Sequence, residues 1–167
     1  MPDELKPRHA RGTTYNLLFV CTGNTCRSPM AEAIARGALR DRGWQHVAVR
    51  SAGIAATTGA GATEQAVDVA REHTLDLATH SAAMLSPELV EWADLILAMG
   101  ASHVRAIIEL GGEEKASLVT AFIEGAGADR AVADPFGGDH DSYRETFDQL
   151  QQAVHALLDR LEPILSP

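Results

Sequence analysis

Cysteine is scarce in this chain, with two among 167 residues. The first 14 residues are polar and contain no apolar stretch of the kind that a signal peptide needs, and we interpret them as a disordered arm. Two cysteines without an export signal indicate a reducing compartment. We therefore expect a cytoplasmic protein in which a cysteine serves catalysis or metal binding rather than a structural crosslink.

Basic residues are also few: 14 Lys and Arg stand against 23 Asp and Glu, which gives a formal net charge of −9. Nucleic acids select basic surfaces, so this charge argues against a nucleic-acid partner. No apolar run approaches the roughly 20 residues of a membrane span, which argues against a membrane partner. We expect residues 15–167 to form one domain with a core of its own.

Short apolar runs alternate with helical patterns along this domain. The alternation predicts an α/β fold, a single-domain three-layer sandwich whose parallel sheet is covered by helices on both faces. The expected strands are residues 16–20, 46–51, 94–99 and 116–122. The expected helices are residues 28–43, 63–72 and 102–110, a segment opened by Ser86-Pro87, and a last helix opened by a capping box at Ser142 and Glu145.

The last helix carries an apolar stripe, and a long loop precedes it. The stripe consists of Tyr143, Phe147, Leu150, Val154, Leu157 and Leu161. The loop, residues 123–140, is rich in Gly, Ala and Asp and shows no period. A loop of this length in a compact domain usually serves function.

The segment VCTGNTCRSP lies between the first expected strand and the first expected helix. Cys21 ends the strand and Arg27 follows six positions later, while Ser28 and Pro29 are typical of an N-cap and a first helical position. A helix N-terminus offers free N–H groups to an anion, and Gly23 lets the loop turn them inward. Such surroundings favour a thiolate, and an arginine suits phosphate oxygens. The pattern predicts a nucleophile in a phosphate site; the alternative is a buried cysteine beside a surface arginine.

This segment, extended to VCTGNTCRSPMAE, resembles the signature V-C-x-G-N-x-C-R-S-P of the low-molecular-weight protein phosphatases. The resemblance covers residues 15–161, and further matching features are Ser51-Ala52-Gly53, His80, residues 93–99 and Asp134-Pro135-Phe136-Gly137-Gly138. It implies the flavodoxin-like strand order 2-1-3-4, phosphorylated proteins as substrates, a bound phosphate or similar oxyanion, and chemistry without cofactor or metal.

The resemblance also implies a role for each matching residue. Cys21 would attack phosphorus and become a phosphocysteine, Arg27 would hold the equatorial oxygens, and Ser28 would donate to the thiolate. Asp134 would protonate the leaving group and then act as a base toward water, although an aspartate before proline is also common in turns. The phosphate-binding loop would be completed by Thr22, Gly23, Asn24, Thr25 and Cys26.

Two residues outside the loop are expected to support it. Asn24 would keep the loop in a strained shape, held by Ser51 and His80, and an ordinary core histidine is the alternative for His80.

Cys26 is either a small buried hydrophobe or the partner of Cys21 in a reversible disulfide. A zinc site is not predicted, because Cys-x4-Cys supplies two ligands and no other pair completes four.

Two positions indicate the substrate. In the family that the sequence resembles, tyrosine-specific members carry an apolar branched residue where this chain has Thr25, and a second aromatic where it has Gly137. The resemblance is therefore greatest to the bacterial protein-arginine-phosphatase branch. Phe136 alone would form one wall of a slot for a flat guanidinium. The segment after Gly53, Ile-Ala-Ala-Thr-Thr, lacks the aromatic wall that relatives often have, so phosphotyrosine stays open as the alternative substrate.

Three other functions account less well for the sequence. Arsenate-reducing relatives use further cysteines downstream, and a nucleotide-binding P-loop needs a second glycine and a lysine; neither feature is present. The alternative of another class is a flavodoxin-like FMN-binding protein, because Thr22-Gly23-Asn24-Thr25 resembles a flavin-phosphate loop. Flavin sites use flanking aromatics, which are only 5% of this chain, and they have no need of Cys21 or Arg27.

Overall fold

The structure is a computed structural model that describes residues 14–165 of the chain. The disordered arm predicted for residues 1–14 lies outside the described residues, apart from Thr14.

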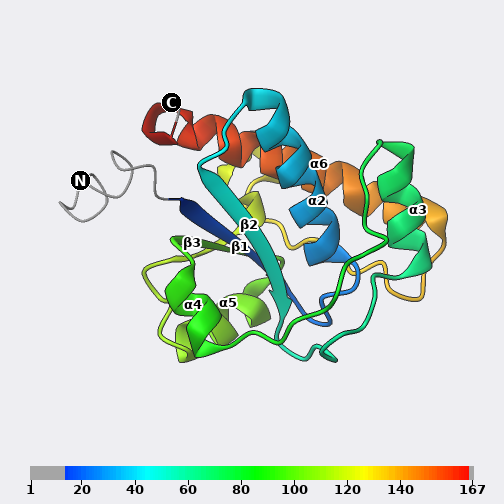
Figure 1. The fold of residues 1–167 in the computed structure, drawn as a ribbon, viewed down its shortest axis with the longest axis horizontal. Coiled ribbons are helices and arrows are strands. Elements are labelled where there is room, and N and C mark those ends of the chain that lie inside the picture. The colour runs from blue at the N-terminus through cyan, green and yellow to red at the C-terminus, as the bar shows by residue number, and fades with distance from the viewer. Residues whose placement is uncertain (1–13, 166–167) are drawn as a thin grey trace.

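Four parallel strands form one sheet in the order β2-β1-β3-β4 (Figure 1). The strands are β1 (Tyr15–Cys21), β2 (Val47–Gly53), β3 (Leu95–Ala98) and β4 (Ala116–Leu118). Cys21 pairs with Gly53 at the end of β2, and Val20 pairs with Ala98 at the end of β3. The predicted sheet and its order are confirmed, and the carboxyl ends of its central strands meet at one edge.

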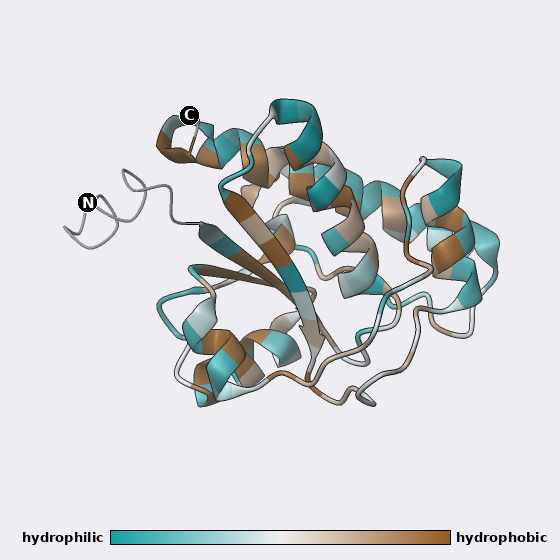
Figure 2. Cartoon of the chain, in the orientation of Figure 1, coloured by the Kyte–Doolittle hydropathy of each residue, from teal (hydrophilic) through white to brown (hydrophobic). Residues whose placement is uncertain are grey.

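Helices cover both faces of the sheet (Figure 1). On one face lie α2 (Arg27–Arg42), α3 (Glu64–Glu72) and α6 (His140–Leu165), and on the other lie α4 (Pro87–Trp92) and α5 (Ala101–Glu109). Side chains of β1 point alternately to the two faces of the sheet. Leu17 and Phe19 pack in the core beneath α2 and α6, whereas Leu18 and Val20 pack in the core against α4 and α5. Figure 2 shows these apolar strands between helices whose outer surfaces are hydrophilic.

The predicted apolar stripe of the last helix is confirmed. All six of its residues are buried on the inner side of α6, and Tyr143 and Phe147 are among the largest fully buried side chains. The helix expected to open at Ser86-Pro87 is also confirmed, and Ser86 caps α4 through its hydroxyl oxygen, as Thr63 does for α3. Gly43 ends α2 with a φ of 72°, which glycine adopts without strain.

Three predicted boundaries are wrong. The fourth strand ends at Leu118, and Val119–Phe122 forms a 3-10 helix that buries Val119 in the core shared with α6. The first helix begins at Arg27, so Ser28 lies in its first turn rather than at its cap. The last helix begins at His140, and Asp139 accepts from the backbone N–H of Ser142 at 2.9 Å, which replaces the predicted capping box.

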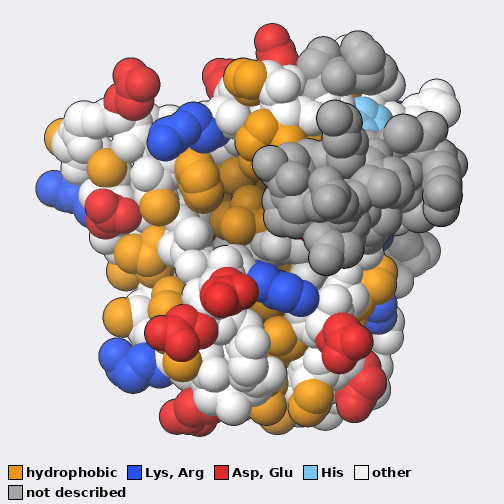
Figure 3. Space-filling view, turned by 90° about the vertical axis from the view of Figure 1, so that its left-hand side faces the viewer, with side chains coloured by type: hydrophobic (Ala, Val, Ile, Leu, Met, Phe, Trp, Pro, Cys, Tyr) orange, Lys and Arg blue, Asp and Glu red, His pale blue; other side chains and the backbone are white. Residues whose placement is uncertain are grey.

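Within residues 14–165 no helix is both long enough and apolar enough to cross a bilayer. On the face in Figure 3, acidic and basic side chains are interspersed among hydrophobic ones outside the grey atoms. The visible part of this face therefore presents no continuous basic surface.

Candidate active site

The loop between β1 and α2 packs directly on the end of β2. A Cβ atom added to Gly53 would lie 2.4 Å from the carbonyl oxygen of Thr22 and 2.9 Å from the backbone nitrogen of Asn24. Real Cβ contacts are never that short, so only glycine allows the loop to approach the strand this closely. This contact explains the glycine of the Ser51-Ala52-Gly53 motif.

Asn24 holds the loop in its unusual conformation. Its φ of 56° lies in the left-handed region, which asparagine tolerates better than most residues. Its side-chain amide donates to Ser28 Oγ at 2.7 Å and to Ser51 Oγ at 2.9 Å, and its carbonyl oxygen Oδ1 accepts from Ala83 N at 2.9 Å. His80 Nε2 donates to the backbone carbonyl of Asn24 at 2.7 Å. The structure thus brings both predicted supporting residues into contact with Asn24.

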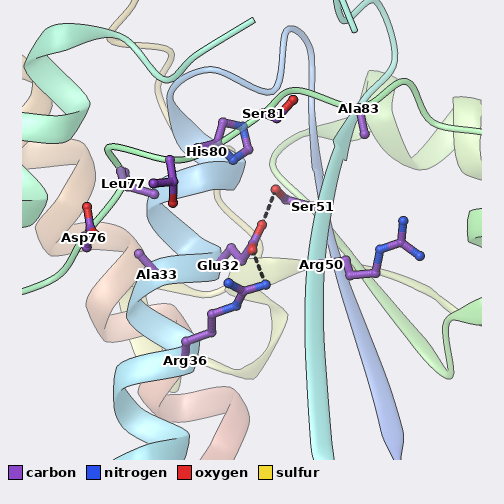
Figure 4. A pocket seen from close by; sticks show the side chains of 11 residues that line it. Glu32, Ala33, Arg36, Arg50, Ser51, Asp76, Leu77, His80, Ser81 and Ala83 are labelled. Carbon is purple, nitrogen blue, oxygen red and sulfur yellow. Dashed lines mark hydrogen bonds and ion pairs between the residues drawn. The ribbon is translucent and has the colours of Figure 1, made fainter. Parts of the chain in front are cut away.

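A further acidic residue stands behind this network. Glu32 of α2 accepts a hydrogen bond from Ser51 Oγ at 2.5 Å and pairs with Arg36 Nη2 at 2.6 Å. Figure 4 shows Glu32, Ser51 and His80 around one pocket on this side of the loop. The sequence reasoning missed Glu32, although it is the acidic residue that closes the quoted VCTGNTCRSPMAE segment.

The thiol of Cys21 lies at the floor of the loop and is 2% exposed. Its Sγ is 2.9 Å from Ser28 Oγ. The Ser28 oxygen accepts a hydrogen bond from Asn24, and the Ser28 hydroxyl has one proton to donate. Cys21 Sγ is nearer to that hydroxyl than the other acceptor, the Ala52 carbonyl at 3.4 Å. A donor in this position stabilises a thiolate.

Arg27 connects the loop to the long segment before α6. Its Nη1 donates to the Val132 carbonyl at 3.0 Å, and its Nη2 donates to Thr22 Oγ1 at 3.4 Å and lies 3.6 Å from Asp134 Oδ2. The guanidinium is nearly buried, whereas the Asp134 side chain is 51% exposed. One buried arginine therefore holds Asp134 over the thiol-bearing loop.

These side chains enclose one pocket of about 210 Å³. Its lining residues are Cys21, Thr22, Gly23, Thr25, Cys26, Arg27, Asp134 and Phe136. Phe136 is the single aromatic among them and is 69% exposed. The structure thus places the predicted nucleophile, cation, acid and pocket wall in one cavity, while Asn24, Ser28, Ser51 and His80 support it from behind.

A histidine that the sequence reasoning missed also reaches the loop. His103, in the first turn of α5, is 3% exposed, and its Nε2 lies 2.9 Å from Thr22 Oγ1. Burial and the nearby Arg27 lower the pKa of His103 to about 4, against a smaller opposite effect of Asp134. The available signal was its position just after β3, at the same edge of the sheet as Cys21.

Cys26 is held by two hydroxyl groups from distant segments. Its Sγ lies 3.3 Å from the Tyr143 hydroxyl and 3.7 Å from Thr63 Oγ1. Burial, and then the hydrogen bond with Cys26, raise the pKa of Tyr143 to about 12, so the phenol is neutral. Both cysteines are free thiols in the structure.

The family assignment comes from comparison with known proteins. The family described as low molecular weight phosphotyrosine protein phosphatase matches residues 16–164. The protein-arginine-phosphatase of Bacillus subtilis (strain 168) is 40% identical over 149 residues, which cover 88% of this chain and 97% of that protein. The low molecular weight protein-tyrosine-phosphatase of Streptomyces coelicolor is 35% identical over 152 residues, 87% of this chain and 92% of that one.

Solved structures agree with this assignment. A mutant of YwlE from Bacillus subtilis superposes with a TM-score of 0.82 at 38% identity, covering 89% of this chain and 99% of that one. A cysteine-to-serine mutant of the YwlE arginine phosphatase, with a phosphorylated active site serine, gives a TM-score of 0.81 at 38% identity over 89% of this chain and 97% of that one. This chain belongs to the low molecular weight phosphotyrosine protein phosphatase family.

Proposed function

We propose that this protein is a cysteine-dependent protein phosphatase that hydrolyses phosphoarginine on proteins through a phosphocysteine intermediate. The observation that carries the proposal is the single pocket that holds Cys21, Arg27 and Asp134 together. A nucleophile, a phosphate-binding cation and a group able to give and take a proton are the three parts that the reaction requires.

In the first step, the phosphoryl group enters the loop, where backbone N–H groups at the start of α2 and the Arg27 guanidinium bind its oxygens. Cys21 Sγ attacks phosphorus and the phosphorus–nitrogen bond breaks. Asp134 gives its proton to the departing guanidine nitrogen. The product arginine side chain leaves, and the phosphoryl group remains on sulfur.

In the second step, the Asp134 carboxylate takes a proton from a water molecule that attacks phosphorus. The sulfur–phosphorus bond breaks, inorganic phosphate is released, and Cys21 returns to the thiolate that Ser28 Oγ stabilises. The mutant of YwlE with a phosphorylated active site serine supports such a phosphoenzyme by similarity.

We also propose that residues 15–167 form a single phosphatase domain that acts on phosphorylated proteins in the cytoplasm. The family match over residues 16–164 supports the domain. The scarcity of cysteine, two among 167 residues, fits a reducing compartment.

The choice of phosphoarginine rests on the walls of the pocket. Thr25 offers a hydroxyl at the pocket wall, and Phe136 offers one aromatic face. No residue of the segment 54–58 is among those that line the pocket. Phosphotyrosine is the alternative substrate, and both substrates occur in the names of relatives: the Bacillus subtilis protein is a protein-arginine-phosphatase and the Streptomyces coelicolor protein a protein-tyrosine-phosphatase.

The deciding experiment compares kcat/KM for phosphoarginine and phosphotyrosine peptides of the same sequence, with EDTA present. We expect the higher value for phosphoarginine, full activity in EDTA, and inhibition by vanadate. A higher value for phosphotyrosine would transfer the assignment to that substrate, and activity that EDTA removes and added metal restores would overturn the cysteine mechanism.

Thr25→Ile is expected to reverse the substrate preference. The threonine hydroxyl can meet the N–H edge of a guanidinium, whereas isoleucine leaves that edge unpaired. An unpaired polar group costs about 1–3 kcal/mol, or roughly 5- to 150-fold in rate if the contact acts in the transition state. We expect kcat/KM to fall for phosphoarginine and to rise for phosphotyrosine. Thr58→Ile, at an exposed position outside the pocket, is the control, and an unchanged ratio in Thr25→Ile would contradict the role of Thr25.

Mild peroxide is expected to inactivate the enzyme reversibly. Peroxide converts Cys21 to a sulfenic acid, and the Cys26 thiol then displaces water from it to form a disulfide that added thiol reduces. Cys26→Ser should make the loss irreversible, because no second thiol traps the sulfenic acid before further oxidation. The measurement is activity before and after dithiothreitol. If Cys26→Ser recovers as fully as the parent, Cys26 serves only packing against Tyr143.

A further inference from the structure

His103 contacts the phosphate loop but has no part in the two steps above. Its Nε2 lies 2.9 Å from Thr22 Oγ1, and its other ring nitrogen, Nδ1, is buried and has no hydrogen-bond partner among the described residues. The same Thr22 oxygen accepts a hydrogen bond from Arg27 Nη2 at 3.4 Å. Thr22 itself lines the pocket, so its hydroxyl stands between the histidine, the arginine and the space for the phosphoryl group.

The surroundings of His103 determine its charge. Burial and Arg27 lower its pKa to about 4, so the ring is neutral at neutral pH and carries one proton. If that proton were on Nδ1, a buried N–H group would have no acceptor, and such groups are rare in native structures. With the proton on Nε2, the ring donates to Thr22 Oγ1 and only a lone pair is left unpaired.

The second arrangement has a consequence for the pocket. A hydroxyl oxygen can accept two hydrogen bonds and donate one. If Thr22 Oγ1 accepts from both Arg27 and His103, its own proton has no partner in the protein and can point into the pocket. In the opposite arrangement the Thr22 proton is consumed by His103 Nε2, and the hydroxyl offers nothing to a phosphoryl oxygen.

We propose that His103 is a positioning residue: as the neutral Nε2–H form it fixes Thr22 so that the threonine hydroxyl donates to the phosphoryl group during transfer. This inference rests on the proposed phosphatase function and adds one donor to the phosphate site. It also explains why a histidine from α5 is buried against the loop, since His103 and Thr22 together keep Arg27 Nη2 directed at the pocket.

Three variants test the donor. His103→Leu supplies a side chain of similar bulk without an N–H group, and His103→Gln returns an amide N–H near the position of Nε2. Thr22→Val replaces the hydroxyl by a methyl group. Loss of one fixed donor to a developing anion costs about 10²- to 10³-fold in turnover at most, and about 10-fold where other donors remain. We expect His103→Leu and Thr22→Val to lower kcat and to weaken vanadate inhibition by about 10- to 100-fold. We expect His103→Gln to recover most of both.

The double variant separates positioning from a general structural effect. If His103 acts through Thr22, His103→Leu combined with Thr22→Val should be no worse than Thr22→Val alone. His73→Leu is the matched control, because His73 stacks on Phe147 with ring centroids 4.2 Å apart and does not line the pocket. It should change neither kcat nor vanadate inhibition.

Nitrogen NMR of the imidazole in the parent enzyme tests the inference without any variant. The proton should be found on Nε2, and the ring should stay neutral from pH 7 down to about pH 5, since its pKa is about 4. A proton on Nδ1 would overturn the proposal, as would equal kcat for His103→Leu and the parent, or equal losses in His103→Gln and His103→Leu. A parent with no turnover of either phosphoarginine or phosphotyrosine would instead reject the proposed function, while the NMR result and vanadate binding would still decide the role of His103.

Discussion

Cys21→Ser is expected to abolish turnover of every phosphorylated substrate. In the proposed mechanism the Cys21 thiolate is the nucleophile, whereas a serine hydroxyl there is not ionised, so the rate should fall by about 10⁴-fold or more. Any phosphoryl group that does transfer to the hydroxyl should stay there, because an alkoxide leaves phosphorus far less readily than a thiolate. We therefore expect intact-mass measurement after incubation with substrate to show one added phosphoryl group, as in the YwlE mutant with a phosphorylated active site serine.

Cys26→Ser is the matched control for this prediction. It makes the same exchange five residues away in the same loop, where the side chain contacts the Tyr143 hydroxyl instead of Ser28. It should keep measurable turnover and should not gain a phosphoryl group at residue 26. Retention of most of the parental rate by Cys21→Ser would remove Cys21 from the chemistry altogether.

The fold and the centre of the site could be predicted because their signals are local in the sequence. The side chains of the apolar run that ends at Cys21 pack alternately into the two cores. The run is recognised from its own residues, without knowledge of distant ones. Cys21, Arg27 and the Ser28-Pro29 helix start lie close together in the sequence, and their spacing together with that helix start predicts a phosphate site. Asp134 is distant in sequence, and only its resemblance to a family motif connected it to the loop.

The contacts that were missed join residues that lie far apart in the chain. Glu32 contacts Ser51, and His103 contacts Thr22 across 81 positions. Tyr143 contacts Cys26 across 117 positions, and it was predicted only as one member of an apolar stripe. No periodicity or spacing reports such pairs, because they exist only after the sheet brings the ends of its strands together.

The wrong boundaries have a related cause. Ser28 has the residue type of a helix cap, but its hydroxyl bonds with Asn24 and Cys21, so the helix begins one position before it, at Arg27. Ser142 and Glu145 match a capping box, yet Asp139, three residues before Ser142, accepts both the N–H and the hydroxyl of Ser142. In each case the folded chain makes a side-chain hydrogen bond other than the predicted one.

In the proposed mechanism, the departure of the leaving group depends on Arg27 and Asp134. Their side chains are 3.6 Å apart, and only that of Asp134 is largely exposed. This exposure lets the Asp134 carboxyl group reach a leaving group at the mouth of the pocket, as the proposed mechanism requires.

Asp134→Asn is expected to damage phosphoarginine hydrolysis much more than hydrolysis of an activated aryl phosphate. The guanidine of arginine is a much stronger base than the phenolate of tyrosine, so the guanidine cannot leave without a proton and the phenolate leaves poorly. Since general acid catalysis contributes about 10²- to 10⁴-fold, kcat/KM should fall by that amount for phosphoarginine, less for phosphotyrosine, and least for an aryl phosphate with an acidic phenol. Asp139→Asn is the matched control, because asparagine also caps helices well and Asp139 lies outside the pocket. In Asp139→Asn, kcat/KM for the three substrates should change little and in equal proportion. Equal losses on all three substrates in Asp134→Asn would show that Asp134 is not the proton donor.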